Sequence, residues 1–212
     1  MLQRVYEAAQ NAKTLERLII ATDDERILMA AKEFGAEVRL TSPAHQSGTD
    51  RVAEVARTVD SLLIINIQAD EPLITGEIID DLVAALQDET IPMATLAART
   101  DDLSLLEEEN IVKVVPDKNG FALYFSRSPL PYQASDYFLR HIGIYGYQKP
   151  FLISFSQMDP SRLEKTEGLE QLRVLENGYR IKIIETQHSL LSVDSPEDII
   201  KVEKFFDKGA NG

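Results

Sequence analysis

The chain has 212 residues, of which 44% are hydrophobic and 27% charged, so it has enough apolar mass for a globular core. It has no cysteine, which excludes disulfides and thiolate metal sites and fits a reducing cytoplasm, and no apolar run long enough to span a membrane. The formal net charge of −13 argues against a nucleic-acid partner, because the phosphate backbone would be repelled.

The first half of the chain alternates between helical and strand periods, which predicts a mainly parallel sheet covered by helices. Gly35 suits the C′ position of the second helix. The apolar run that begins at Leu62 predicts a buried strand. Helices are expected at residues 2–12, 25–34, 50–59 and 76–87, and strands at 17–21, 37–40 and 62–67.

The second half is richer in strands, which are expected at residues 93–98, 111–115, 121–125 and 140–147. Asp117-Lys-Asn-Gly120 predicts a hairpin turn between two of them. We therefore expect a β-rich insertion, or an antiparallel edge, at about residues 111–150 within a single α/β domain covering 1–212. Ser161-x-x-Glu164 is typical of a capping box that opens a helical region to about residue 176, and Ser195-Pro196 begins a last helix.

Two adjacent carboxylates, Asp70 and Glu71, follow the predicted strand at 62–67 in the sequence NIQADEP. Ligands bind at the carboxyl ends of strands in open α/β sheets, but a turn capped by Asp70 and stopped by Pro72 is an equal alternative. Asp194 precedes the last helix, where capping is its simpler interpretation. Magnesium prefers one or two protein carboxylates together with substrate phosphate oxygens, and Asp70 with Asp194 can supply that pair.

Another candidate site is the polar loop from His45 to Arg51, which contains Gly48 and leads into a helix. Backbone N–H groups at such a helix start can bind an anion. The alternative is an ordinary helix capped by Thr49 with Arg51 in solvent. No Walker sequence and no G-x-G-x-x-G is present.

A third group of candidates lies in the β-rich part and the helical region after it. The strand period of two places His141, Gly143 and Tyr145 on one face, which is unusual for a core face, although a surface edge strand would also allow it. Glu170 and Arg173 have the spacing of an ordinary surface ion pair. The remaining polar candidates are Arg127 after a strand, Arg140 beside His141, and Gln171.

Taken together, these segments resemble the 3-deoxy-manno-octulosonate (Kdo) cytidylyltransferases, also called CMP-Kdo synthetases. Of the matching stretches, YFSRSPLP, RHIGIYGY and LEQLRVLE are specific in combination, whereas QADEP is shared with related nucleotidyltransferases. The others are ATDDERI, AHQSGTDR, PMATLA, VKVVPDKNG and VDSPEDI, so that the resemblance spans nearly the whole chain in the order of the family.

The resemblance implies an α/β fold of the nucleotide-diphospho-sugar-transferase type, a cytoplasmic homodimer, and the Mg²⁺-assisted reaction CTP + Kdo → CMP-Kdo + pyrophosphate, which supplies lipopolysaccharide biosynthesis. It assigns Mg²⁺ to Asp70 and Asp194. Arg127, with His141 if protonated, would pair with the sugar carboxylate. The resemblance also places Arg51, Gln68, Ser47 and Gly48 near the nucleotide, and Arg127, Arg140, His141, Tyr145, Glu170 and Gln171 around the sugar acid.

Two departures from the family pattern qualify these expectations. Members of the family begin with a strand and a phosphate-gripping loop of the type PAR…STR…GKP, and this sequence begins about where that segment ends. We expect the natural protein to include it. The loop between Tyr132 and Tyr137 is also shorter than usual. The alternatives are a cytidylyltransferase for another acidic keto-sugar, such as 8-amino-Kdo or sialic acid, or a non-catalytic sugar- or nucleotide-binding module.

Overall fold

The computed structural model describes residues 1–188, 193, 198–200 and 202–204. The chain divides into two compact units: unit 1 comprises residues 1–44, 67–80 and 189–212, and unit 2 comprises 45–66 and 81–188. Residues 198–200 and 202–204 are helical, and the predicted start of that helix at Ser195 lies outside the described residues.

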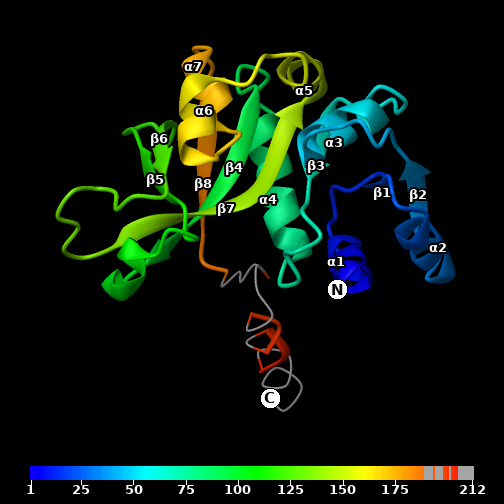
Figure 1. Cartoon of the computed structure of the whole chain (residues 1–212), viewed down its shortest axis with the longest axis horizontal. Coiled ribbons are helices and arrows are strands. Elements are labelled where there is room, and N and C mark those ends of the chain that lie inside the picture. The colour runs from blue at the N-terminus through cyan, green and yellow to red at the C-terminus, as the bar shows by residue number, and fades with distance from the viewer. Residues whose placement is uncertain (189–192, 194–197, 201, 205–212) are drawn as a thin grey trace. The chain divides into compact units, whose positions relative to one another are not determined.

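Unit 1 contains a short parallel sheet and the helices that belong to it (Figure 1). Strand β1 pairs with β2 in parallel, with Ile19 opposite Glu37. Helix α2 starts after Asp24, whose carboxylate accepts a hydrogen bond from the Arg26 backbone N–H at 2.7 Å, and Gly35 beyond its end has φ +78°, as predicted. The elements are α1 Leu2–Ala9, β1 Ile19–Thr22, α2 Glu25–Glu33, β2 Glu37–Leu40 and the first turn of α4 Gly76–Leu86.

The start of α4 is fixed against the segment that follows α1. A Cβ atom on Gly76 would lie 2.4 Å from the carbonyl carbon of Asn11, so only glycine allows this approach. Asp80 accepts hydrogen bonds from the backbone N–H of Lys13 at 3.2 Å and of Thr14 at 2.9 Å. These contacts anchor the far end of the segment that carries Asp70.

Unit 2 is built on a mixed sheet with the strand order β6-β5-β7-β4-β8, and β3 also pairs with β7. Only β4 and β8 run parallel, and the other pairs are antiparallel. The fold class, α/β with helices against a sheet, is therefore confirmed, but the sheet is mixed rather than mainly parallel. The elements are α3 Gly48–Ala56, β3 Leu63–Asn66, β4 Met93–Thr100, 3-10 helix η1 Leu103–Glu107, β5 Lys113–Pro116, β6 Ala122–Ser126, β7 Phe138–Gln148, α5 Lys149–Phe155, α6 Arg162–Glu167, α7 Leu172–Glu176 and β8 Ile181–Thr186.

Long antiparallel strand β7 organises this sheet, as Figure 1 shows by its course alongside β4. The register between them shifts: Tyr145 lies opposite Thr95, but Ile142 lies opposite Leu96, so Gly143 and Ile144 form a bulge. The predicted hairpin between β5 and β6 is confirmed, with Gly120 at φ +74°.

The expectation of a buried strand at residues 62–67 is wrong in part. Strand β3 exists, but it runs antiparallel to β7, and Leu62 before it is 81% exposed. Leu63, Ile64 and Ile65 are half-buried, and within β3 only Asn66 is buried. The apolar run predicted a strand correctly, whereas its burial depends on which strands lie beside it.

The helices of unit 2 pack on its sheet, with α7 against β6 and α5 against β7 and α3. The capping box of Ser161 and Glu164 is confirmed, but the expected helical region is divided into α6 and α7 at Gly168, where φ is +65°. The largest fully buried side chains of this core include Tyr147, Phe125 and Phe155. No helix in the described ranges is long and apolar enough to cross a membrane.

Candidate active site

One face of β7 carries polar and aromatic groups where a core face would be apolar. His141, Gly143 and Tyr145 are half-exposed, while Ile142 and Ile144 between them are buried. The rings of His141 and Tyr145 lie 5.5 Å apart, which confirms that they share a face. A Cβ on Gly143 would meet nothing within 4 Å, so the face is open between the two rings.

Adjacent residues of a strand point to opposite faces, so Arg140 leaves β7 on the other side from His141. The structure therefore brings His141 and Tyr145 together, and strand alternation assigns Arg140 to the opposite face.

His141 is held in a neutral environment. Its Nε2 lies 3.0 Å from the hydroxyl of Thr95, and the Phe125 ring contacts it edge-on at 5.0 Å between centroids. Burial lowers the pKa of His141 to about 3. The imidazole is therefore neutral at neutral pH, so it can offer a hydrogen bond but no positive charge.

Glu170 and Gln171 lie in the connection between α6 and α7, beside the start of α3. The Thr49 hydroxyl donates a hydrogen bond to Oε2 of Glu170, and Gln171 is only 4% exposed. Neither Oε1 of Glu170 nor Nε2 of Gln171, both buried, has a hydrogen-bond partner among the described residues. Buried polar atoms are nearly always paired, so such atoms are suited to meet the hydroxyl groups of a ligand.

The expected i,i+3 ion pair of Glu170 and Arg173 is present, but it is not on the surface. Arg173 is buried and makes a two-pronged ion pair with Glu164, through Nε at 2.7 Å and through Nη2. Its Nη2 is 3.8 Å from Oε1 of Glu170, which is too long for a hydrogen bond. The ion pair of Arg173 and Glu164 thus joins α6 to α7, and the hydrogen bond that Glu170 accepts comes from Thr49.

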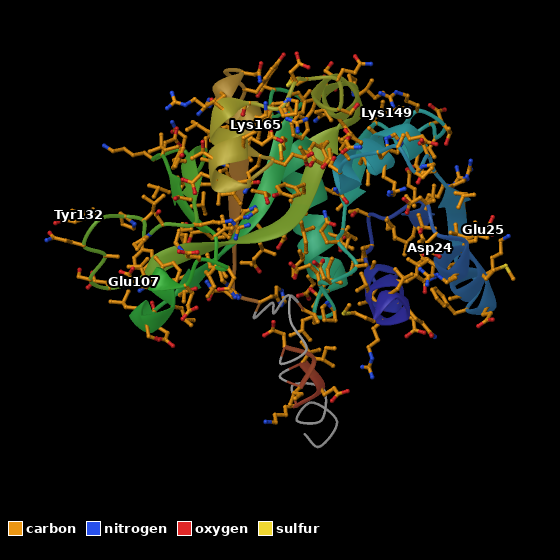
Figure 2. All side chains as sticks on the ribbon, viewed as in Figure 1. Asp24, Glu25, Glu107, Tyr132, Lys149 and Lys165 are labelled. Carbon is orange, nitrogen blue, oxygen red and sulfur yellow. The ribbon has the colours of Figure 1, made fainter. Side chains whose placement is uncertain are left out.

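Arg127 follows β6 and lines a pocket of about 300 Å³. Its Nε donates to the backbone oxygen of Glu167 at 3.0 Å and its Nη1 to that of Glu109 at 2.9 Å. The other lining residues are Glu107, Ser128, Pro129 and Thr166, and Figure 2 shows Glu107 at the surface of unit 2.

Lys113 supports Arg127 from within the protein. This fully buried ammonium donates to three backbone oxygens, those of Glu108 at 3.0 Å, Ile111 at 2.7 Å and Arg127. Burial lowers the pKa of Lys113. Lys113 thereby connects the turn at residues 108–111 with Arg127, which follows the end of β6.

The start of α3 is capped by Ser47, whose hydroxyl accepts a hydrogen bond from the Asp50 backbone N–H at 3.1 Å. The predicted alternative, a cap at Thr49, is wrong, because Thr49 is already inside the first turn and buried. Gly48 is the first helical residue and is exposed, and Arg51 is half-buried.

In unit 1, Gln68 and Asp70 lie in the turn after β3 and are both half-buried. Asp70 does not cap a helix, because α4 begins only at Gly76. The backbone oxygen of Asp70 accepts a hydrogen bond from the Val193 N–H at 2.9 Å. This contact places the neighbour of Asp194 beside Asp70, whereas Asp194 itself lies outside the described residues.

Sequence reasoning missed three residues that support the candidate groups: Thr49 beside Glu170, Lys113 behind Arg127, and Glu167. Glu167 accepts from the Ser126 hydroxyl at 2.9 Å and from the Arg127 N–H at 3.0 Å. Each contact joins residues at least 14 positions apart, so no local pattern could have indicated it. The apolar setting of Lys113, within IVKVV, was the only signal available.

Comparison with known proteins decides the family. Residues 1–183 match the family model described as cytidylyltransferase. A 3-deoxy-manno-octulosonate cytidylyltransferase of Solibacter usitatus is 50% identical over 97% of this chain and 84% of its own length, and one of Geotalea daltonii is 45% identical over 99% and 89%. This chain belongs to the 3-deoxy-manno-octulosonate cytidylyltransferase family.

Solved structures agree with this membership. A CMP:2-keto-3-deoxy-manno-octonic acid synthetase in complex with CTP matches 98% of this chain and 88% of its own, with a TM-score of 0.92 and 36% identity. HddC from Yersinia pseudotuberculosis, with a TM-score of 0.70 and 12% identity, shares the fold alone. The chain is accordingly a nucleotidyltransferase of the cytidylyltransferase family, and the motifs YFSRSPLP, RHIGIYGY and LEQLRVLE lie in unit 2.

Proposed function

We propose that this cytidylyltransferase transfers the cytidylyl group of CTP to Kdo, with release of pyrophosphate. Support comes from its family membership over nearly the whole chain. The observation that carries the proposal is the face of β7, on which His141, Gly143 and Tyr145 are open to a ligand while their neighbours are buried. The product would supply lipopolysaccharide biosynthesis in the cytoplasm, where CTP is available.

In the proposed reaction, the anomeric hydroxyl oxygen of Kdo attacks the α-phosphorus of CTP in line. The bond from the α-phosphorus to the oxygen bridging it to the β-phosphate breaks, and the hydroxyl proton passes to solvent or to the departing pyrophosphate. Such a transfer depends on positioning and on charge neutralisation more than on covalent chemistry by the protein.

The sugar acid is assigned to unit 2. Arg127 supplies the positive charge for its carboxylate, a valuable feature in a chain of net charge −13. His141, being neutral, contributes a hydrogen bond rather than a charge. The other sugar-binding residues are Tyr145, Glu170 and Gln171. Buried polar atoms of Glu170 and Gln171 would form hydrogen bonds with hydroxyl groups of the sugar.

The nucleotide is assigned to Ser47, Gly48, Arg51 and Gln68. The exposed start of α3 at Gly48 offers backbone N–H groups to a phosphate, and the helix dipole favours an anion there.

Mg²⁺ is the proposed cofactor, held by Asp70 and Asp194. The backbone hydrogen bond from Val193 to Asp70 fits this assignment, because it brings the two carboxylate-bearing segments of unit 1 together. Two carboxylates leave most of the coordination sphere for phosphate oxygens and water, as Mg²⁺ requires. When bound, the ion would neutralise the phosphate charge.

A pyrophosphate-release assay with CTP and Mg²⁺ tests the function directly. We expect Kdo to be the best substrate, ahead of 8-amino-Kdo and N-acetylneuraminate, with UTP as the nucleotide control. A higher kcat/KM for either sugar analogue would change the substrate assignment, and no nucleotide-dependent release with any of them would refute the enzyme. Light scattering of the same preparation tests the homodimer that the resemblance implies.

A further inference from the structure

Thr49 occupies an unusual position for a residue of a helix start. It lies one residue after the first residue of α3 and is only 3% exposed. Ser47 already caps the helix, so the Thr49 hydroxyl is not needed there. It donates instead to Oε2 of Glu170, which lies 121 positions further along the chain. The contact joins α3 to the connection between α6 and α7 within unit 2.

The direction of this hydrogen bond follows from its acceptor, because a carboxylate oxygen accepts and the Thr49 hydroxyl donates. Tyr147 is fully buried beside Thr49, and burial raises the pKa of its hydroxyl well above 10, although hydrogen bonding to Thr49 and Asn66 opposes the rise. The phenol is therefore protonated at neutral pH and can donate. A threonine hydroxyl has a single proton, so donation to Glu170 leaves Thr49 to accept from Tyr147. Such a chain of hydrogen bonds is self-reinforcing.

In this arrangement the two oxygens of Glu170 have different surroundings. Oε2 is engaged by Thr49, while Oε1 is buried without a hydrogen-bond partner in the described part of the chain. Nη2 of Arg173 makes an ion pair with Oε1 at 3.8 Å, a distance too long for a hydrogen bond. A rotation of the carboxylate would break the Thr49 bond, so the orientation of Oε1 depends on that bond.

We propose that Thr49 is a positioning residue for sugar recognition: its hydroxyl fixes the Glu170 carboxylate so that Oε1 accepts a hydrogen bond from a hydroxyl group of the sugar acid. This inference rests on the proposed function, because it assumes that Glu170 meets the sugar. It gives Thr49 a role other than the helix cap that its motif suggested.

Steady-state kinetics of Thr49→Val tests the proposal, because valine keeps the shape of threonine and loses the hydroxyl. We expect the KM for Kdo to rise roughly tenfold, with kcat and the KM for CTP within about twofold of wild type. Thr49→Ser restores the hydroxyl and should recover the wild-type KM. Thr58→Val is the matched control, because that exposed hydroxyl donates to the Val55 backbone oxygen of its own helix end.

A double variant separates positioning from a merely structural role. In a Glu170→Gln background, Thr49→Val should raise the KM for Kdo no further, because both changes act on one contact. An unchanged KM in Thr49→Val, or an equal rise in both backgrounds, overturns the proposal. So does a KM for Thr49→Ser that stays as high as that of Thr49→Val.

Calorimetric titration of Kdo keeps this inference distinct from the proposed function. If wild-type protein binds Kdo without turning it over, the proposed reaction fails, and the dissociation constants of the Thr49 variants still decide the inference. If wild-type protein does not bind Kdo at all, both are overturned. A normal wild-type KM with unaffected variants refutes the role of Thr49 alone.

Discussion

The two units hold their candidate groups in different settings. In unit 2 the polar side chains around the sugar candidates are built into the interior: Lys113 is fully buried, and the Arg173 and Glu164 side chains are 9% and 13% exposed. In unit 1 the comparable ion pair, between Arg17 and Glu37, is 42% and 36% exposed.

This difference predicts how each unit responds to mutation. A buried charge that loses its partner has no water to replace it, whereas an exposed charge does. In unit 2, the contacts that orient candidate groups also stabilise the fold, so substitution there should affect binding and stability together. In unit 1, the half-buried Asp70 lies in a turn, so its chemistry can be removed without loss of the fold.

The largest expected effect is a loss of activity without a loss of stability, in a variant of unit 1. Asp70→Asn should lower kcat by about three orders of magnitude or more, because the amide is a poor Mg²⁺ ligand, while the melting temperature stays within about 2 °C. Asp194→Asn should behave alike. Pyrophosphate release at saturating Mg²⁺ is the measurement, with the exposed Asp60→Asn as control. A nearly wild-type rate in either variant would remove that residue from the metal site.

The next effect contrasts the ion pairs of the two units. Arg173→Met leaves Glu164 buried without its partner and should lower the free energy of unfolding by about 3 kcal/mol. Arg17→Met, which breaks the exposed pair, should shift the melting temperature by less than about 2 °C. Urea unfolding and thermal melts followed by circular dichroism give both values. Equal destabilisation by the two changes would contradict the difference inferred between the buried ion pair of unit 2 and the exposed ion pair of unit 1.

Arg127→Ala probes binding in unit 2. The KM for Kdo should rise by about one to two orders of magnitude, since a charged hydrogen bond to the sugar carboxylate is lost. The KM for CTP should stay the same. Arg162→Ala, an exposed arginine of α6, is the control. An unchanged KM for Kdo would take Arg127 out of the sugar site.

The smallest effect is a pH dependence of stability that arises from His141. Its folded-state pKa of about 3 lies below the ordinary value of 6.5, so between these values the unfolded chain binds the proton and the folded chain does not. Stability should therefore fall as the pH drops below 6.5, with a slope from this group of up to about 1.4 kcal/mol per pH unit. His141→Asn should lose that part of the slope in urea titrations from pH 7 to 5, and an unchanged slope would contradict the burial of a neutral imidazole.

Much of the fold was predictable because its signals are local. The capping box at Ser161, the hairpin turn at Gly120 and the left-handed Gly35 follow from the chemistry of a few neighbouring residues. The strand period likewise placed His141 and Tyr145 on one face correctly. The direction of a strand could not be predicted from local sequence. Strands β3 and β7 are antiparallel partners, and an apolar run alone does not indicate which strands lie beside it.

The sequence by itself indicated most of the elements, the family and the candidate site residues, because residue type and short-range spacing encode them, but it predicted neither α5 nor β8. Only the tertiary structure decided what each residue does in its surroundings. It paired Arg173 with Glu164 and Glu170 with Thr49, and it placed Val193 beside Asp70. It also enclosed His141 enough to lower the pKa of its imidazole, which is therefore neutral. The physical reason is that hydrogen-bond partners and burial depend on residues that are distant along the chain and meet only when it folds.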